Sequence, residues 1–152
     1  MENKKVFVIT ITHLKDNQDI VSLNSGITTA AGTTKILPTV PDSLKKLVVD
    51  FIFQSIEGKE ASISNEILDT ASKVADFDTL LLVLTEDANI VTTIFGFIIQ
   101  EKPGIKLYGI LYDVKSKKVL AIAQTRNIIS DKLKQASLVS AGKNLVQKIL
   151  SD

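Results

Sequence analysis

Residues 106–127 carry the pattern that most constrains the fold. The stretch KLYGILYDVKSKKVLAIAQTRN reads as two β-strands joined by a lysine-rich turn at residues 114–118. Apolar and β-branched residues dominate on both sides of a short polar break, which is typical of strands around a turn. Strands joined by so short a connection pair antiparallel. We therefore expect the second half of the chain to form an antiparallel meander, around which the other elements are arranged.

Three further stretches are typical of strands. Residues 4–14, with the sequence KKVFVITITHL, are largely apolar on both faces and predict a strand inside a sheet. Residues 78–86 form a near-continuous apolar run, as in a central strand. Residues 90–100 follow, and Pro103 and Gly104 suit the two central positions of a type II turn after them. These two residues are therefore expected to have a structural role in a turn.

Helical periodicity is found over residues 41–58, 64–78 and 129–150. The stretch 15–41 is rich in Gly, Thr, Ser and Asn, which predicts a long, mobile loop. The order strand, helices, meander, helix predicts an α+β two-layer sandwich, in which the meander and the amino-terminal strand form the sheet and about three helices pack on it. We expect residues 1–152 to form a single domain.

Composition excludes several classes of function. The absence of cysteine excludes disulfides, thiolate metal sites and thiol nucleophiles. The net charge is +1, and Arg126 is the only arginine, so we expect no nucleic-acid partner. The longest apolar stretches have the length of strands, so no transmembrane segment is predicted. No motif organises a metal or a cofactor, and we expect neither.

One arrangement nevertheless favours an enzyme. His13 is the only histidine, and Asp16 and Asp19 are the carboxylates close to it in the sequence. A deep pocket lined by His13, Asp16 and Glu86 would favour an enzyme. In this alternative, the chain is a small hydrolase or ligand-binding enzyme in which His13 and the nearby carboxylates lie under the 15–41 loop. A lone histidine at a strand end is more often structural. We therefore expect no catalytic residue, although enzymatic activity remains the second hypothesis.

Residues 26–35, with the sequence GITTAAGTTK, resemble a phosphate-binding loop in composition alone. Five residues separate Gly26 from Gly32, whereas a P-loop has four, and Lys35 does not directly follow the second glycine. A flexible loop is therefore the better interpretation.

Lysines gather in the turn of the 106–127 hairpin. Lys115, Lys117 and Lys118 could contact an anionic partner, and Lys106 is predicted to join them. Lysines at such positions also prevent aggregation between strand edges, which requires no partner. Asp113 directly precedes the turn and is expected to accept hydrogen bonds from turn amides.

The hairpin also supports a resemblance. The sequence LYDV, a short polar turn and then KVLAIAQT, preceded by SKVADFDTLLLVLTEDANIVTTIFGFIIQ, resembles bacterial envelope lipoproteins over residues 64–150. The rhombotarget-type, curli-secretion and penicillin-binding-protein-activator lipoproteins have similar hairpins, but Ser116, Lys117 and Lys118 stand where those families have Thr-Gly. The resemblance implies a periplasmic or envelope-attached protein whose lipid anchor is missing from the printed sequence. If Met1 is the native start, the expected location is the cytoplasm instead.

Residues 90–100 are apolar on both faces of the predicted strand, and a sheet covered by helices on one side would leave one of those faces bare. We expect a homodimer or a protein partner to cover it. The candidate interface residues are the apolar and aromatic side chains of this strand and the next: Ile94, Phe95, Phe97, Ile99, Tyr108 and Tyr112. The leading hypothesis is a non-enzymatic binding or assembly module of the bacterial cell envelope that recognises a protein partner or self-associates.

Overall fold

The computed structural model describes residues 5–151, except for the side chains of residues 98 and 99. One sheet has the strand order β1-β2-β3-β4, in which β1 and β2 are parallel and the other pairs are antiparallel. In chain order the elements are β1 (Val6–Ile11), α1 (Asn17–Ala31), α2 (Asp42–Ile56), α3 (Asn65–Ser72), β2 (Thr79–Ile94), β3 (Phe97–Asp113), β4 (Lys118–Ile128) and α4 (Lys134–Leu150).

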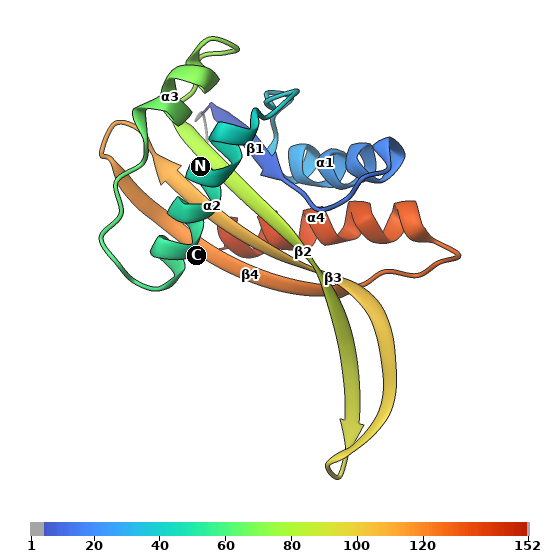
Figure 1. Ribbon diagram of the computed structural model, residues 1–152. Helices are drawn as coiled ribbons and strands as arrows, with labels where there is room; N and C mark the ends of the chain where they lie inside the picture. The colour runs from blue at the N-terminus through green and yellow to red at the C-terminus, as the bar shows by residue number, and fades with distance from the viewer. Residues whose placement is uncertain (1–4, 152) are drawn as a thin grey trace.

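The α+β class, with helices packed on a sheet that joins the meander to the amino-terminal strand, is confirmed. The structure adds that the helices are shared between the two faces of the sheet. Helices α2 and α3 lie over one face, and α1 and α4 lie over the other (Figure 1). Both faces of the sheet, and not one face alone, are therefore packed against helices of the same chain.

The first half of β2 explains why its sequence is a continuous apolar run. Leu80, Leu82 and Leu84 point into the core beneath α2 and α3. Leu81 and Val83 point into the core beneath α1 and α4. Because successive side chains of a strand point to opposite faces, a strand that is buried on both sides needs apolar residues at every position.

The expectation of a mobile loop over residues 15–41 is wrong, because helix α1 occupies most of it. Asp16 caps the helix by accepting from the backbone N–H groups of residues 18 and 19. Leu23 and Ile27, four residues apart, are buried against α4. Gly26 is buried where an added Cβ would lie 2.1 Å from the Val139 carbonyl oxygen. The small and polar residues that suggested a loop thus include one that lets two helix backbones approach closely.

The expected turn at Pro103 and Gly104 is also wrong, because both residues lie inside β3. They are paired with Asn89 and Ala88 of β2. Gly104 is required for packing, since an added Cβ would lie 2.7 Å from Cγ1 of Ile90. These two residues are typical of turns, but cross-strand packing places them within a strand.

The chain turns at Phe95 and Gly96 instead. Both residues have positive φ angles, 52° and 82°, as the central residues of a two-residue hairpin turn require. The two stretches predicted as separate strands, 78–86 and 90–100, therefore belong to one long hairpin made of β2 and β3.

The hairpin of residues 106–127 is found as predicted, with β3 ending at Asp113 and β4 beginning at Lys118. Asp113 accepts hydrogen bonds from the backbone N–H of Ser116 at 2.9 Å and from its hydroxyl at 2.6 Å. Lys117 takes the positive φ of 56° that a Gly would otherwise provide in this turn.

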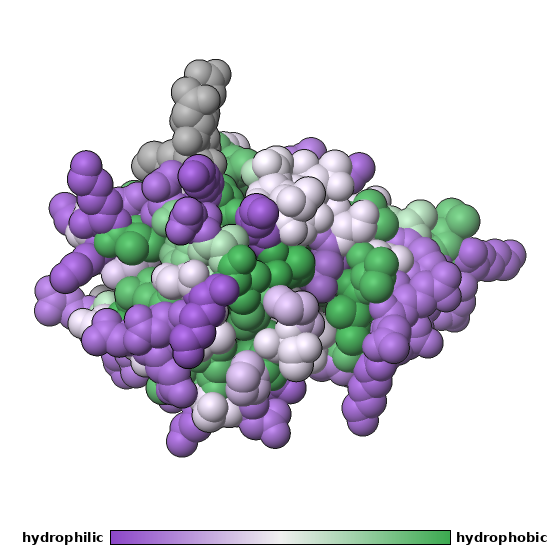
Figure 2. Space-filling model, turned by 90° about the horizontal axis from the view of Figure 1, so that it is seen from above, coloured by the Kyte–Doolittle hydropathy of each residue, from purple (hydrophilic) through white to green (hydrophobic). Residues whose placement is uncertain are grey.

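Figure 2 shows the molecule from above the view of Figure 1, where helices and the start of the sheet meet the surface. Hydrophilic side chains form most of the rim of this view, and apolar residues appear in a central band between them. This mixture is ordinary for a folded protein. The unusual apolar exposure lies at the opposite end of the molecule.

Candidate functional site

Strands β2 and β3 continue well beyond their neighbours. Strand β1 ends at Ile11, opposite Leu84, and β4 ends at Ile128, opposite Gly104. Residues 88–103, called the arm below, form a two-stranded ribbon that projects away from the rest of the described chain, called the body (Figure 1). The seven residues of β2 in the arm span roughly 23 Å at the usual rise of a strand.

The tip of the arm exposes large apolar side chains. Phe95 is 94% exposed, Phe97 75% and Ile94 52%. No charged residue occurs between Asp87 and Glu101, so residues 88–100 of the arm are uncharged. Isolated two-stranded ribbons are marginally stable in water, and aromatic side chains are usually found in contact with other apolar groups. The tip therefore has the properties of a surface that binds another molecule.

Three of the candidate interface residues thus lie together at the tip. The predicted contribution of Ile99 concerns a side chain outside those that the structure describes, although its backbone belongs to β3.

The expectation that Tyr108 and Tyr112 belong to the interface is wrong, because both are buried under α2. The Tyr108 ring packs on Phe53 with 5.3 Å between centroids, and Tyr112 packs on Phe51 at 5.7 Å. The Tyr108 hydroxyl donates to Oε1 of Glu86 at 2.5 Å. Burial raises the pKa of the Tyr112 phenol. These tyrosines lie in the part of β3 that belongs to the body, where α2 covers the sheet.

A second uncovered apolar surface lies on β4. Leu120, Ile122 and Ile128 are 45%, 39% and 45% exposed. Ile122 is paired with Ile110, whose side chain lies in the core beneath α2, so these alternate residues face the α2 side of the sheet. Of β4, only Val119 packs against that core. We call the surface formed by Leu120, Ile122 and Ile128 the open face.

Two cations lie on the same side of the sheet. Arg126 of β4 is paired across the strands with Lys106 of β3. The Lys106 ammonium lies 4.7 Å from the centre of the Tyr108 ring. Within residues 5–151, the ion pairs found do not include either cation. Glu86 of β2 lies opposite Lys106 on its other side, so this cross-strand row carries two cations and one acid. Arg126 is the member on the edge strand, where it can meet an external carboxylate.

The predicted lysine cluster is smaller than expected. Lys115, Lys117 and Lys118 are exposed together around the β3–β4 turn. Lys106 does not join them, because it lies in the middle of β3, beside Arg126. These three lysines stay candidate anion contacts.

His13 lies between a threonine and an aspartate. Its Nε2 is 3.0 Å from Oδ1 of Asp87, and its Nδ1 is 2.8 Å from the Thr85 hydroxyl, which also contacts the Thr12 hydroxyl at 2.7 Å. Thr85 is buried, so this hydroxyl cannot reach a substrate. The arrangement fixes the end of β1 against β2.

The pocket expected of a hydrolase, lined by His13, Asp16 and Glu86, does not form. Asp16 caps α1, and Glu86 accepts from a tyrosine hydroxyl, so neither carboxylate contacts His13. A cavity of about 230 Å³ borders His13 and Asp87, but Asp16 and Glu86 do not line it. The segment expected to act as a lid is helix α1 and its connections.

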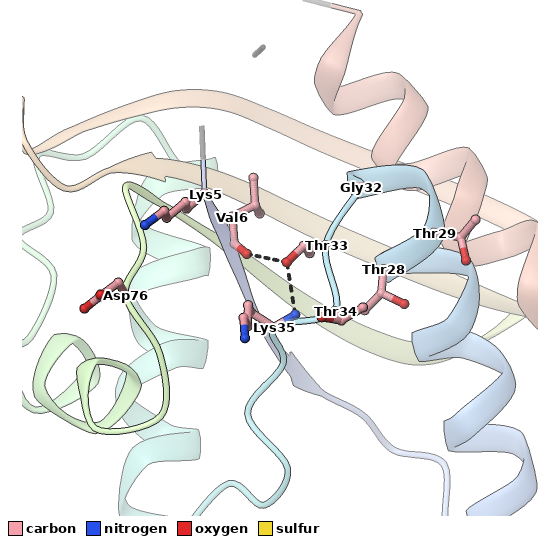
Figure 3. A pocket seen from close by; sticks show the side chains of 9 residues that line it. All are labelled: Lys5, Val6, Thr28, Thr29, Gly32, Thr33, Thr34, Lys35 and Asp76. Atoms are coloured by element: carbon pink, nitrogen blue, oxygen red, sulfur yellow. Dashed lines mark hydrogen bonds between the residues drawn. The ribbon is translucent and has the colours of Figure 1, made fainter. Parts of the chain in front are cut away.

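A shallow depression of about 620 Å³ lies where α1 ends beside the start of β1 (Figure 3). The Thr33 hydroxyl donates to the Val6 carbonyl at 2.8 Å and accepts from the Lys35 N–H at 3.0 Å. Lys5, Lys35 and Asp76 supply its charged side chains. The depression lies at the carboxyl end of a helix, where the helix dipole disfavours anions. Residues 26–35 therefore lack the geometry of a phosphate site.

An ion pair joins α1 to the beginning of α4. Oδ2 of Asp19 lies 2.9 Å from the Lys134 ammonium, and Nε2 of Gln135 donates to Oδ1 at 2.9 Å. The hydrogen bonds from Lys134 and Gln135 hold the pKa of the Asp19 carboxyl below its usual value. The side chain of Asp19 is buried, and this contact stabilises the helix pair.

Among the described residues, no three His, Asp or Glu side chains gather in a way that could hold a metal ion. The helices within residues 5–151 are too short or too polar to cross a membrane.

Neither a protein-family model nor a curated protein sequence matches the chain. Several solved structures are similar to it. A dodecamer of PelC from Paraburkholderia phytofirmans is 15% identical, with 97% of this chain and 84% of that chain covered and a TM-score of 0.44. The hypothetical protein CT253 from Chlamydia trachomatis is 12% identical, with coverages of 97% and 94% and a TM-score of 0.46. Lipoprotein GNA1162 from Neisseria meningitidis is 13% identical, with coverages of 97% and 99% and a TM-score of 0.42.

Proposed function

We propose that this chain is a non-enzymatic binding and assembly module of the bacterial cell envelope, and that it self-associates through the arm. The observation that carries the proposal is the exposure of Phe95 and Phe97 at the tip of a ribbon that nothing in the body supports. An uncharged, aromatic tip gains free energy when another apolar surface covers it.

A protein partner suits the arm better than a lipid bilayer. Both edges of a two-stranded ribbon present backbone N–H and C=O groups that have no partner within the ribbon, and hydrocarbon would leave them unsatisfied. A membrane-binding tip usually places cations beside its apolar residues to meet lipid phosphates. Here residues 88–100 have no cation, and the root of the arm carries three acids, Glu86, Asp87 and Glu101, beside one cation, Lys102.

The location in the envelope is supported by the sequence resemblance of residues 64–150 to envelope lipoproteins. The gene sequence upstream of Met1 tests it directly. An apolar leader that ends in a small residue followed by cysteine is the expected result. A native start at Met1 would contradict the envelope location but would leave the arm as a binding element.

Sedimentation velocity tests self-association. We expect the wild-type chain to form oligomers between about 1 and 100 µM, where contacts of roughly 5–8 kcal/mol become populated. Phe97→Asp places a charge at the tip and should weaken association at least about tenfold. Val21→Asp is the matched control, because Val21 is an exposed apolar residue of α1, far from the arm in the chain.

A wild-type chain that stays monomeric throughout this range contradicts the proposal. A monomer that floats with phospholipid vesicles, and loses this property in Phe97→Asp, would show instead that the arm binds membranes. Equal loss of association in Val21→Asp would show that the arm has no special role.

A further inference from the structure

We infer that the arm of one copy packs on the open face of a second copy, so that each chain carries both halves of the contact. This inference rests on the proposed self-association and names the surface that receives the arm. The open face consists of Leu120, Ile122 and Ile128, which are exposed on the α2 side of β4.

Geometry prevents the arm from covering the open face of its own chain. The arm extends β2 and β3 away from the body, whereas β4 lies across the body and ends at the root of the arm (Figure 1). Strand β4 stops at Ile128, opposite Gly104, which is where the arm begins. Two apolar surfaces therefore stay uncovered within one chain, and a second copy always supplies both in equal amounts.

The open face is the better receiving surface because the other sheet edge is already covered. On the outer side of β1, the Val8 N–H donates to the Lys35 carbonyl and the Leu37 N–H donates to the Val8 carbonyl, both at 2.9 Å. On β4, the Lys148 ammonium donates to the Gln124 carbonyl at 2.8 Å. This bond occupies one carbonyl of that edge, and an apolar tip gains most free energy by covering apolar side chains. We therefore place the arm on the side chains of the open face rather than as a fifth strand at the edge of β4.

The charges of the two surfaces are complementary. The tip that meets Leu120 and Ile122 is uncharged, so it buries no ionised group. The charged residues of the arm are Glu101 and Lys102, and Arg126 and Lys106 lie on the same side of the sheet as the open face. The ion pairs of the described residues involve none of these side chains. Lys106 has Glu86 opposite it on β2, so Arg126 on the edge strand is the cation that an intermolecular Glu101 would meet.

The expected contact is small. A buried aromatic side chain removes about 150–250 Å² from solvent, so Phe95 and Phe97 together remove roughly 300 Å². With the partner surface included, one contact buries roughly 600 Å² in total, which is below the roughly 1,000 Å² expected of a specific interface. If two chains exchange arms reciprocally, the buried area doubles; if the contact runs head to tail, it continues into a ring or a filament.

Mixing two defective chains tests the inference. Phe97→Asp destroys the arm but leaves the open face, whereas Leu120→Lys/Ile122→Lys destroys the open face but leaves the arm. We expect each variant to sediment as a monomer and an equimolar mixture to form a 1:1 heterodimer through the one remaining intact contact. This dimer should bind no more tightly than the wild type. Thermal unfolding of each variant confirms that the body is folded.

The outcomes separate this inference from the proposed function. If Leu120→Lys/Ile122→Lys associates like the wild type while Phe97→Asp is monomeric, the arm binds elsewhere and the inference is overturned, but the proposed function stands. If the wild type never associates, both fail.

Cysteine cross-linking gives a second measurement that tolerates a fold weakened by the two lysines. The chain has no cysteine, so single cysteines report unambiguously. Phe95→Cys mixed with Ile122→Cys should form a disulfide-linked heterodimer under mild oxidation. Phe95→Cys mixed with Val21→Cys is the control. Equal yields in the two mixtures would overturn the inference.

Discussion

The two halves of strand β2 both contain large apolar residues, in TLLLVLT over residues 79–85 and in NIVTTI over residues 89–94, but they have opposite surroundings. Residues 79–85 are buried on both faces, whereas residues 91–94 are exposed. Both halves are paired with β3 along their length. The difference is that β1 and the helices accompany only the first half. An apolar strand is therefore stabilised by the layers that pack on it, and the same strand becomes a binding element where those layers end.

The largest expected difference in stability lies between these two halves. Leu82→Ala removes a fully buried side chain from the core and should lower the free energy of unfolding by about 2–5 kcal/mol. Ile94→Ala in the same strand should change it by no more than about 0.5 kcal/mol. Urea unfolding followed by circular dichroism measures both. Similar losses in the two variants would mean that the arm packs against the body in solution.

Gly26→Ala tests the closest approach within the body. The added methyl group would lie 2.1 Å from the Val139 carbonyl oxygen, so α1 and α4 must move apart. Overpacking of this kind costs about 1–3 kcal/mol. The control is Ser25→Ala, the exposed neighbour in the same helix, which should leave stability unchanged or slightly raise it. A stable Gly26→Ala variant would contradict the close packing of the two helices.

Most of the body could be predicted from the sequence because its elements have strong local signals. The 106–127 hairpin, the 41–58 helix and the central apolar strand each combine a clear periodicity with identifiable ends. Helix α1 was missed because its Ser, Thr and Gly residues have low helix propensity, and its stability comes from packing on α4. The caps Asp16 and Gly32 were the local signals that could have revealed it.

The arm was predicted only in part, for a different physical reason. The apolar character of residues 90–100 made Ile94, Phe95 and Phe97 candidate interface residues, and the structure shows that all three are exposed. The turn was misplaced because Pro103-Gly104 is the stronger local turn signal, and the sequence does not show that Gly104 lies beneath Ile90. The open face depends on which strand α2 leaves uncovered, and that is a tertiary property.

The ion pair of Asp19 should make the body sensitive to acid. Because the pKa of Asp19 is lowered in the folded chain, its stabilisation is present above the usual titration range of a carboxyl and is lost as pH falls through the folded value. Asp19→Asn should lower Tm by a few degrees at neutral pH, and the difference should shrink as pH falls below the usual titration range of a carboxyl. The arm variant Phe97→Ser is the control, since its Tm should follow the wild type at every pH. A constant difference for Asp19→Asn would show that packing, and not charge, is responsible.

The smallest expected effect on stability comes from removing residues 91–101, the outer part of the arm. Ile90 and Lys102 are paired across β2 and β3, so residues 91–101 can be replaced by Asn-Gly, which forms a tight two-residue hairpin turn. This deletion keeps Ile90 on Gly104 and keeps the hydrogen bond from the Ile129 N–H to the Pro103 carbonyl. The free energy of unfolding should stay within about 0.5 kcal/mol of the wild type, because the deleted side chains that the structure describes are all exposed. The same variant should be monomeric in sedimentation. A loss of cooperative unfolding would mean that the body needs the arm in order to fold. The body would then not be stable by itself, and the apolar residues of the arm would not serve a second molecule alone.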